Sequence, residues 1–219
     1  MLKTITMRCV SAVAACAMLV GCSSVEPVAY TGIASSSQLQ PDPNDESGHI
    51  PYRYATQVDW RNYTKAMIDP VAIYRGTDNQ FGDMDDNDRA TLGSYMQVQF
   101  AEKLATRFQL TNTPGPNTLR IKLTLTGATT TPLVAPATHV DIAGNLYNSV
   151  QAIRGGEGLM AGSAIYAVEI YDASTSRLLS AYVTKQYPGA LNVGASFGSM
   201  GAAKTGIDKG ADALVAQLK

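Results

Sequence analysis

The amino-acid sequence predicts an α+β domain in which a mostly antiparallel sheet carries two main helices packed on one face. Three observations support this fold class. Apolar residues recur three to four positions apart over residues 83–108 and alternate with polar residues from Leu119 to Leu125. Strand-forming stretches flank a polar turn at residues 172–176, and a second helical pattern ends the chain. Two helices are therefore available to cover one face of a small sheet.

The first predicted elements are a strand and a helix. Residues 66–74 are rich in strand formers, and Pro70, which cannot donate to a ladder, indicates an edge position or a strand start. The helix over residues 83–108 begins with several aspartates, which cap its first turn and complement its dipole. Its apolar residues share one face: Leu92, Tyr95, Met96, Phe100, Leu104 and Phe108.

The second half of the predicted domain consists of a strand, an irregular insert, a hairpin and a helix. The alternating strand is followed by residues 127–161, which are rich in Thr, Pro, Ala and Gly, with a short helix expected near residues 140–153. Residues 163–171 and 178–187 are expected to form the hairpin. A glycine-rich connection over residues 189–201 leads to the last helix, whose apolar face carries Ile207, Ala211, Leu214 and Leu218.

The N-terminal segment predicts export. Lys3 and Arg8 lie near its start, and an apolar run follows from Cys9 to Val20. A basic start, a short apolar stretch and small residues before a cleavage point are typical of a secretory signal peptide. The run covers only about a dozen residues, whereas crossing a bilayer takes roughly 20, so the pattern disfavours a transmembrane helix.

The end of this segment predicts lipid attachment. A cysteine directly follows Leu-Val-Gly in Leu19-Val20-Gly21-Cys22, which narrows the prediction to a bacterial lipoprotein signal. We expect residues 1–21 to be removed and Cys22 to be acylated, with palmitate or similar chains; an ordinary signal peptide in which Cys22 is incidental is the alternative. Several acyl chains anchor a protein firmly, whereas one chain does so only marginally. Ser23 after the cysteine favours the outer membrane, on its periplasmic face.

The mature chain is expected to have two parts. Residues 22–51 are interpreted as a lipidated N-terminus and flexible tether, because residues 23–50 contain few large apolar side chains. Residues 52–219 are interpreted as a single α+β periplasmic domain. Fifteen basic and 18 acidic residues give the mature chain a net charge of −3, which argues against a nucleic-acid partner.

Chemistry-bearing motifs are weak, and we expect no catalytic residue, cofactor or metal. Cys9 and Cys16 leave with the signal peptide, which excludes thiol catalysis. Ser196 lies in a G-x-S-x-G pattern, but both histidines, His49 and His139, precede it, against the hydrolase order. A flexible loop is the favoured interpretation there.

Other patterns have ordinary structural interpretations. Residues 198–205 resemble a phosphate-binding loop, but Ala203 stands where glycine is needed, so a helix start is favoured. Residues 83–88 alternate oxygen ligands as a calcium loop does, yet they lack its glycine and its final glutamate. An aromatic group after residue 51 is interpreted as core and edge packing, with a docking surface as the alternative: Tyr52, Tyr54, Trp60 and Tyr63.

Several stretches together resemble a Gram-negative lipoprotein family that is catalogued only as a domain of unknown function. The resemblance extends over most of residues 31–219 and is carried by Thr31-Gly32-Ile33, Gln38-Leu39-Gln40-Pro41, and the stretches 63–71, 114–120 and 168–179. It implies an extracytoplasmic lipoprotein and supplies no catalytic residue. The order of elements is also similar to that of small periplasmic lipoprotein domains that assist envelope machines, such as activators of peptidoglycan synthases.

The expected function is non-catalytic. An outer-membrane lipoprotein would present a binding or accessory domain to a protein partner in the cell envelope, and lipid anchoring at Cys22 would raise its effective concentration there. A periplasmic serine hydrolase using Ser196 and a small-ligand-binding lipoprotein are the alternatives.

Overall fold

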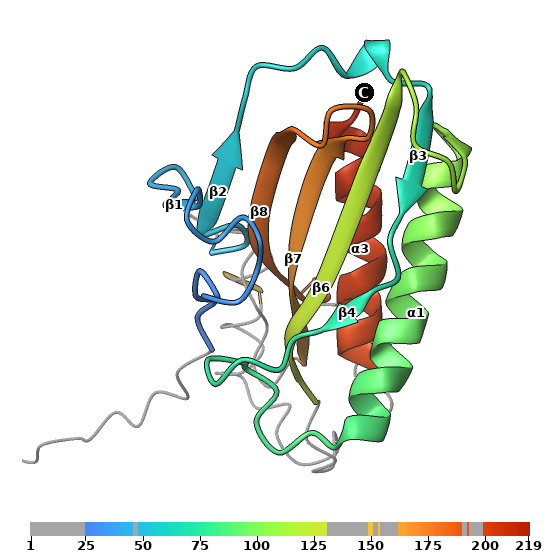
Figure 1. Ribbon diagram of the computed structural model, residues 1–219. Helices are drawn as coiled ribbons and strands as arrows, with labels where there is room; N and C mark the ends of the chain where they lie inside the picture. Colours follow the sequence, from blue (N-terminus) through green and yellow to red (C-terminus); the bar gives the residue numbers. More distant parts are fainter. Residues whose placement is uncertain are drawn as a thin grey trace, which may run out of the picture.

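A computed structural model describes residues 25–45, 48–130, 149–150, 153, 162–189, 192 and 199–219. The predicted signal peptide, Cys22 and most of the predicted insert lie outside these ranges. The described residues form one 8-stranded mixed sheet with two long helices (Figure 1). The predicted α+β class is therefore confirmed.

Three long antiparallel strands form the centre of the sheet. They are β6 (Thr118–Thr129), β7 (Ser163–Asp172) and β8 (Leu178–Gln186). On the β8 side, β2 (Tyr52–Ala55) and β1 (Gln40–Pro41) continue the antiparallel order. The predicted alternating strand and the predicted hairpin strands are thus confirmed.

The β6 side of the sheet is parallel. There β3 (Lys65–Ile68) pairs with β6 and with β5 (Gln109–Leu110), and β4 (Ala72–Ile73) pairs with β6 further along. Pro70 lies between β3 and β4, where the missing amide hydrogen costs no ladder bond. The single strand predicted over residues 66–74 is therefore two short strands. A short 3-10 helix, η1 (Trp60–Asn62), precedes β3.

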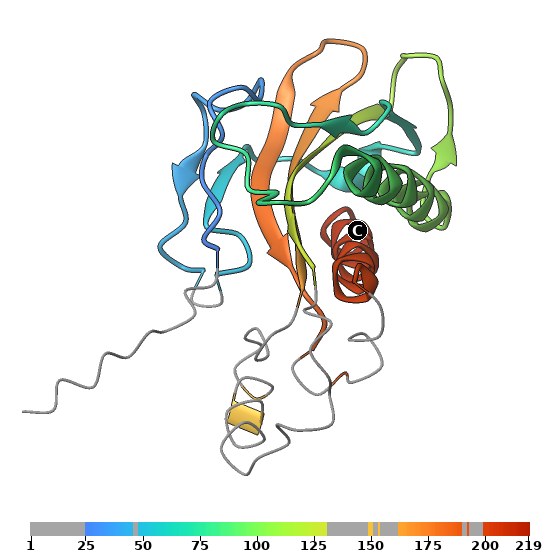
Figure 2. The same cartoon turned by 90° about the horizontal axis from the view of Figure 1, so that it is seen from below.

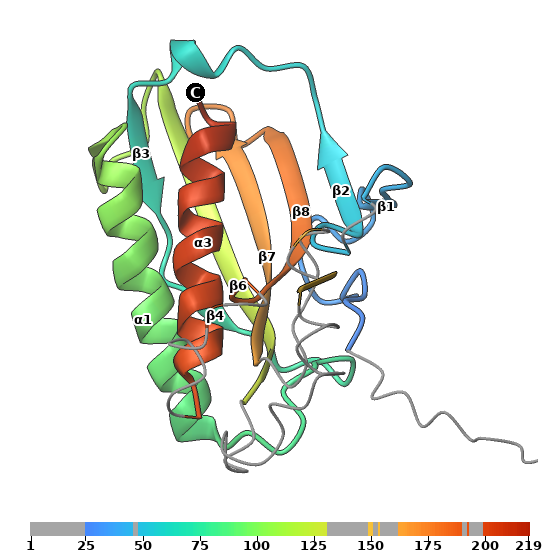
Figure 3. The same ribbon diagram turned by 180° about the vertical axis from the view of Figure 1, so that it is seen from behind.

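Both helices, α1 (Asp86–Ala105) and α3 (Gly201–Gln217), cover the same face of the sheet (Figure 3). Asp85 caps α1 by accepting a hydrogen bond from the Asp88 amide at 2.8 Å. The predicted apolar face of α1 is buried at Leu92, Met96, Phe100 and Leu104, each 0 % exposed. This core also receives the inward-facing residues of β6 and β7, including Ile121 and Val168.

Small residues let α3 approach the sheet closely. A Cβ atom added at Gly206 would lie 2.4 Å from the backbone oxygen of Gln186, and one added at Gly210 would lie 1.6 Å from the Tyr166 hydroxyl. Neither position has room for a side chain. The helix therefore depends on glycine at these two contacts.

The opposite face of the sheet is partly covered by residues 25–39, which we call the strap. Figure 2 shows the strap and the helices on opposite sides of the strands. Tyr30, Ile33 and Leu39 of the strap are at most 7 % exposed and pack against residues of β7 and β8 such as Ile165 and Val183. The segment is buried because its few apolar side chains, although widely spaced, all meet one apolar sheet face.

The strap corrects the flexible tether that the sequence predicts over residues 22–51. Residues 25–39 pack on the sheet, so the folded domain includes residues well before Tyr52, and β1 adds an edge strand from the same predicted tether. Composition was misleading because three buried side chains are enough to hold on the sheet a segment whose other residues are mostly small or polar. Within the described ranges, no helix has the length and apolarity needed to span a membrane.

Candidate functional site

Several residues singled out from the sequence lie outside the described ranges. These are Cys22, His139 and Ser196 with the surrounding G-x-S-x-G pattern. Acylation of Cys22 and the hydrolase alternative therefore stay predictions.

The described candidates for metal binding have structural roles. His49 stacks on Tyr187 with ring centroids 4.4 Å apart, and its Nδ1 lies 2.9 Å from the Lys185 carbonyl oxygen. Asp85, from the calcium-like pattern, caps α1. No group of three or more His, Cys, Asp and Glu side chains suited to a metal occurs among the residues that the structure describes.

The aromatic group after residue 51 packs as the structural interpretation predicts. Tyr63 is 8 % exposed and donates its hydroxyl to Asp172 Oδ2 at 2.9 Å, across the top of the sheet. Trp60 packs against the helix-side core, whereas Tyr52 and Tyr54 pack against the apolar cluster under the strap. These side chains are divided between two faces, so they do not form one docking surface.

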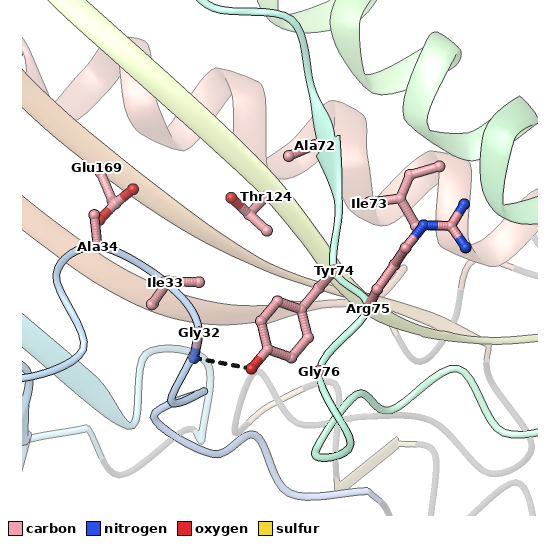
Figure 4. A pocket seen from close by; sticks show the side chains of 10 residues that line it. All are labelled: Gly32, Ile33, Ala34, Ala72, Ile73, Tyr74, Arg75, Gly76, Thr124 and Glu169. Atoms are coloured by element: carbon pink, nitrogen blue, oxygen red, sulfur yellow. Dashed lines mark hydrogen bonds between the residues drawn. The ribbon is translucent and has the colours of Figure 1, made fainter.

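The candidate site is a shallow depression of about 360 Å³ where the strap crosses the sheet (Figure 4). It opens between the strap, β4 with the turn after it, and the middle of β6 and β7. Its lining is mainly apolar, with one arginine and one glutamate: Gly32, Ile33, Ala34, Ala72, Ile73, Tyr74, Arg75, Gly76, Thr124 and Glu169. This volume lies at the lower end of the range of small-molecule pockets, about 300–1,000 Å³.

Tyr74 holds the strap against the sheet. The pairing of β4 with β6 places it there, and its amide donates to the Leu125 carbonyl at 2.9 Å. Its hydroxyl accepts a hydrogen bond from the Gly32 amide at 3.0 Å and donates to Asp78 Oδ1 at 2.6 Å. Asp78 Oδ2 in turn accepts from the Thr31 amide at 3.0 Å. One tyrosine and one aspartate thus satisfy two consecutive strap amides.

The electrostatics of this contact favour the ionised aspartate. Hydrogen bonds from the Tyr74 hydroxyl and the Thr31 amide lower the pKa of Asp78. Nearby, burial raises the pKa of Tyr30 to about 12, and the Tyr30 hydroxyl donates to Gln80 Oε1. At neutral pH the neutral Tyr30 phenol and the ionised Asp78 carboxylate therefore both help to hold the strap.

Two glycines make room for the Tyr74 ring. A Cβ atom at Gly32 would lie 2.9 Å from the ring, and one at Gly76 would lie 2.2 Å from the hydroxyl oxygen. The Tyr74 ring also meets the Tyr30 ring edge-on, with centroids 5.4 Å apart. The ring is 7 % exposed, so the wall of the depression is fixed in place.

Glu169 is the buried charged group of the depression. It lies on β7, on the strap side of the sheet, and is 3 % exposed. Its Oε1 accepts hydrogen bonds from the Ser35 amide at 2.6 Å and the Tyr171 hydroxyl at 3.2 Å. The Ser35 hydroxyl beside it is also buried and has no hydrogen-bond partner within the described part of the chain. A buried hydroxyl without a partner is unusual, because desolvation is costly unless it is compensated.

The sheet surface next to the depression carries both basic and acidic side chains. Arg120 on β6 contacts Asp69 with two nitrogens, at 2.8 Å and 2.9 Å, so that the charges of the two side chains offset each other. Lys122, two residues further along β6, lies 5.1 Å from the centre of the Tyr171 ring. Burial, followed by the proximity of Glu169, raises the pKa of Tyr171 to about 12. Tyr171 therefore stays neutral and bridges Glu169 to this surface.

These groups are suited to binding. Among the described lining residues there is no serine, cysteine or histidine that could act as a nucleophile with an adjacent base. This site was not predictable from the sequence, since Glu169 looks like an ordinary strand residue and Tyr74 like an edge residue. Only the alternation of β7, which puts Glu169 on the face opposite Val168, was available in advance.

Comparison with known proteins assigns the domain to a family. Residues 29–214 match the model of a family described as a protein of unknown function (DUF3313). The chain belongs to the DUF3313 family. The match confirms the resemblance to a family of unknown function, and it begins within the strap, in agreement with the strap being part of the folded DUF3313 domain.

Solved structures are similar only at a distance. Two dodecameric structures of PelC from Paraburkholderia phytofirmans, one of them a single-residue variant, share 9 % and 10 % sequence identity with this chain. They cover 73 % and 74 % of it, and 94 % and 93 % of their own chains, with TM-scores of 0.37 and 0.36. Scores this low carry no argument about this protein. No curated protein matches the sequence.

Proposed function

We propose that this DUF3313 protein is a lipoprotein anchored to the outer membrane through Cys22, and that its domain binds a protein partner of the cell envelope without catalysis. The Leu19-Val20-Gly21-Cys22 sequence supports the anchor, and Ser23 supports the outer membrane. The observation that carries the binding function is the depression between the strap and the sheet, with Glu169 at its base.

The depression has the rigidity that recognition requires. Its wall residue Tyr74 is held by two hydrogen bonds and by glycines on both sides of the ring. Its carboxylate, on Glu169, is held by an amide and a phenol. Groups that are already ordered lose little entropy when a partner binds, and this increases affinity.

The exposed rim lets a partner reach these groups. Ala72 and Arg75 line the depression and are exposed, whereas Glu169 and Tyr74 are buried behind them. A partner side chain that enters would meet an apolar wall, an arginine and the buried carboxylate.

Site-specific photocrosslinking in cells tests this proposal. A photoreactive amino acid replaces Ala72 in one strain and, in a matched strain, Ser94, an exposed residue of α1, the helix that covers the opposite face of the sheet from the strap. We expect one envelope protein to be captured from position 72 and not from position 94. Intact mass of the purified protein reports acylation of Cys22, and Cys22→Ala should abolish both the acylation and the capture.

Two outcomes would contradict the proposal. A mature protein whose mass shows no acyl chain would contradict the proposed lipid anchor. Capture from positions 72 and 94 alike, or from neither, would contradict the proposal that the depression is the binding surface.

A small-ligand function is the second candidate, because the depression has the volume of a small pocket and is lined by both apolar side chains and the buried Glu169. A ligand that binds the folded state raises its melting temperature. A rise in Tm with one class of small envelope solute, lost in Glu169→Gln, would support this function. A flat response over a broad panel would count against it.

A further inference from the structure

The folded domain begins very close to the proposed lipid anchor. Val25 already packs against the apolar cluster under the strap, and Pro27 is buried. The Glu26 carbonyl accepts a hydrogen bond from Gln80 Nε2 at 2.7 Å. Only Ser23 and Ser24 separate Val25 from Cys22 in the sequence.

Covalent geometry limits the separation between anchor and domain. Consecutive Cα atoms are about 3.8 Å apart, so the three steps from Cys22 to Val25 span at most about 11 Å in any conformation. A tether of the predicted length, 22–51, would instead allow the domain to move tens of ångströms away. We propose that the domain is held against the lipid headgroups with one defined end toward the membrane; this inference rests on the proposed acylation of Cys22.

The contacts of the strap identify the end that faces the membrane. Gln80, which binds Glu26, forms a bridge with Gly127 near the C-terminal end of β6. This is the lower end in Figure 1, where the turn after β4 lies and where α1 begins. The opposite end of the sheet carries η1 and the hairpin between β7 and β8. Because β6 has 12 residues, the two ends are separated by up to about 36 Å.

A long tether would form only if the strap dissociated from the sheet, and this dissociation is costly. Release would expose Tyr30, Ile33 and Leu39, which are all buried. It would also break the contacts of Asp78 with Thr31 and of Tyr74 with Gly32. The short connection to Cys22 is therefore a stable property of the folded protein.

Charge opposes close contact but does not prevent it. Four aspartates at the start of α1 lie at the same end of the domain and would be repelled by anionic headgroups: Asp83, Asp85, Asp86 and Asp88. At physiological ionic strength such repulsion is largely screened beyond about 8 Å, whereas several acyl chains anchor a protein firmly. We therefore expect the start of the strap, at Val25 and Glu26, to lie nearest the membrane and the start of α1 to tilt away from it.

Energy transfer to the membrane surface tests this placement. The mature chain has no cysteine other than Cys22, so a single introduced cysteine can be labelled with a donor dye. Thr77→Cys labels the turn after β4, and Asn62→Cys labels η1 at the opposite end; both residues are exposed. The lipidated full-length variants are purified from membranes and placed in phosphatidylethanolamine–phosphatidylglycerol vesicles that contain headgroup-labelled acceptor lipid. We expect several-fold greater energy transfer from position 77 than from position 62.

A linker variant supplies the control. A flexible Gly-Ser insert of about twelve residues between Ser24 and Val25 has a root-mean-square length of roughly 20 Å, which should greatly reduce the difference between the two positions. Equal transfer from both positions without the insert would overturn the placement, and so would a difference that the insert leaves unchanged. Intact mass of the same samples separates the two proposals. Acylated protein with equal transfer contradicts the placement alone, whereas unacylated protein contradicts both.

Discussion

The Tyr74 hydroxyl accepts a hydrogen bond from the Gly32 amide at 3.0 Å and thereby joins the strap to the turn after β4. The two residues are 42 positions apart in the sequence and belong to segments that the sequence assigns to different parts of the protein. Their contact makes residues 25–39 part of the folded domain. It also forms one wall of the depression that we propose as the binding site.

Removal of this hydroxyl should loosen the strap. Tyr74→Phe leaves the Gly32 amide without its acceptor and Asp78 without one donor. We expect a loss of about 1–2 kcal/mol in the free energy of unfolding, measured by urea denaturation. Tyr52→Phe is the matched control, because Tyr52, on β2, packs against the apolar cluster under the strap to which Tyr74 also belongs. Equal losses in both variants would show that the Tyr74 contact has no special role.

Truncation of a buried strap residue tests whether the segment is a domain element or a tether. Tyr30 is 1 % exposed, so Tyr30→Ala should cost about 3–5 kcal/mol, as large-to-small changes of aromatic core residues do. Ser37→Ala, at an exposed strap residue, should change stability by less than about 0.5 kcal/mol. Thermal or urea unfolding measures both. A flexible tether would instead leave Tyr30→Ala as harmless as Ser37→Ala.

The close approach of α3 to the sheet predicts that replacing Gly210 with alanine destabilises the fold. Alanine gains up to about 1 kcal/mol over glycine in a helix, but a Cβ at Gly210 would lie 1.6 Å from the Tyr166 hydroxyl. Overpacking of this kind costs about 1–3 kcal/mol, so we expect Gly210→Ala to lower the free energy of unfolding. Tyr166→Phe removes the atom in closest contact and should recover part of the loss in a double-mutant cycle.

Gly93 in α1 is the matched control for this substitution. A Cβ there would lie 3.5 Å from Ile73 Cγ1, which is an ordinary van der Waals contact. Gly93→Ala should therefore be neutral or stabilising by up to about 1 kcal/mol. A loss at Gly93 as large as that at Gly210 would contradict the proposed steric cause.

The hydrogen bonds to Asp172, at the end of β7, predict that the free energy of unfolding decreases at low pH. Hydrogen bonds, first from the Ser174 hydroxyl and then from Tyr63, hold the pKa of Asp172 far below its ordinary value of about 3.9. Because the folded pKa is depressed, the stabilisation is present above the unfolded pKa and is lost as the pH falls below about 4. Asp172→Asn should therefore lower stability at pH 6 and reduce its further decrease toward pH 3, as measured by urea unfolding.

The control for this pH dependence replaces a different carboxylate. Asp83→Asn removes one negative charge at an exposed residue near the start of α1. We expect its pH profile to follow that of the wild type. A parallel change in both variants would assign the effect to net charge and not to the hydrogen bonds of Asp172.

The fold was largely predictable because its strongest signals are local. The spacing of Leu92, Met96, Phe100 and Leu104 defines a helix face wherever the helix lies. The alternation from Leu119 to Leu125 defines a half-buried strand in the same way. The parallel pairing of β3 and β4 with β6 was not predictable, because strand pairing between distant segments leaves no periodic pattern in the sequence.

The candidate site was not predictable for the same reason. Glu169 is buried where the strap crosses the sheet, and the amide that donates to it belongs to Ser35, 134 residues earlier in the chain. Gly32 and Gly76 accommodate the Tyr74 ring, and this role depends on a contact between segments that are distant in the sequence.

The amino-acid sequence by itself therefore determined the α+β class, both helices and the central hairpin, because each follows from the period of apolar residues along a short stretch. It also contains the linear motif Leu19-Val20-Gly21-Cys22, from which we predict the lipid anchor and which needs no folded context to be recognised. Only the tertiary structure decided that residues 25–39 belong to the domain and that Glu169 lies at the base of a depression. Burial of a few separated apolar side chains depends on the surface they meet, and that surface exists only after the sheet has formed.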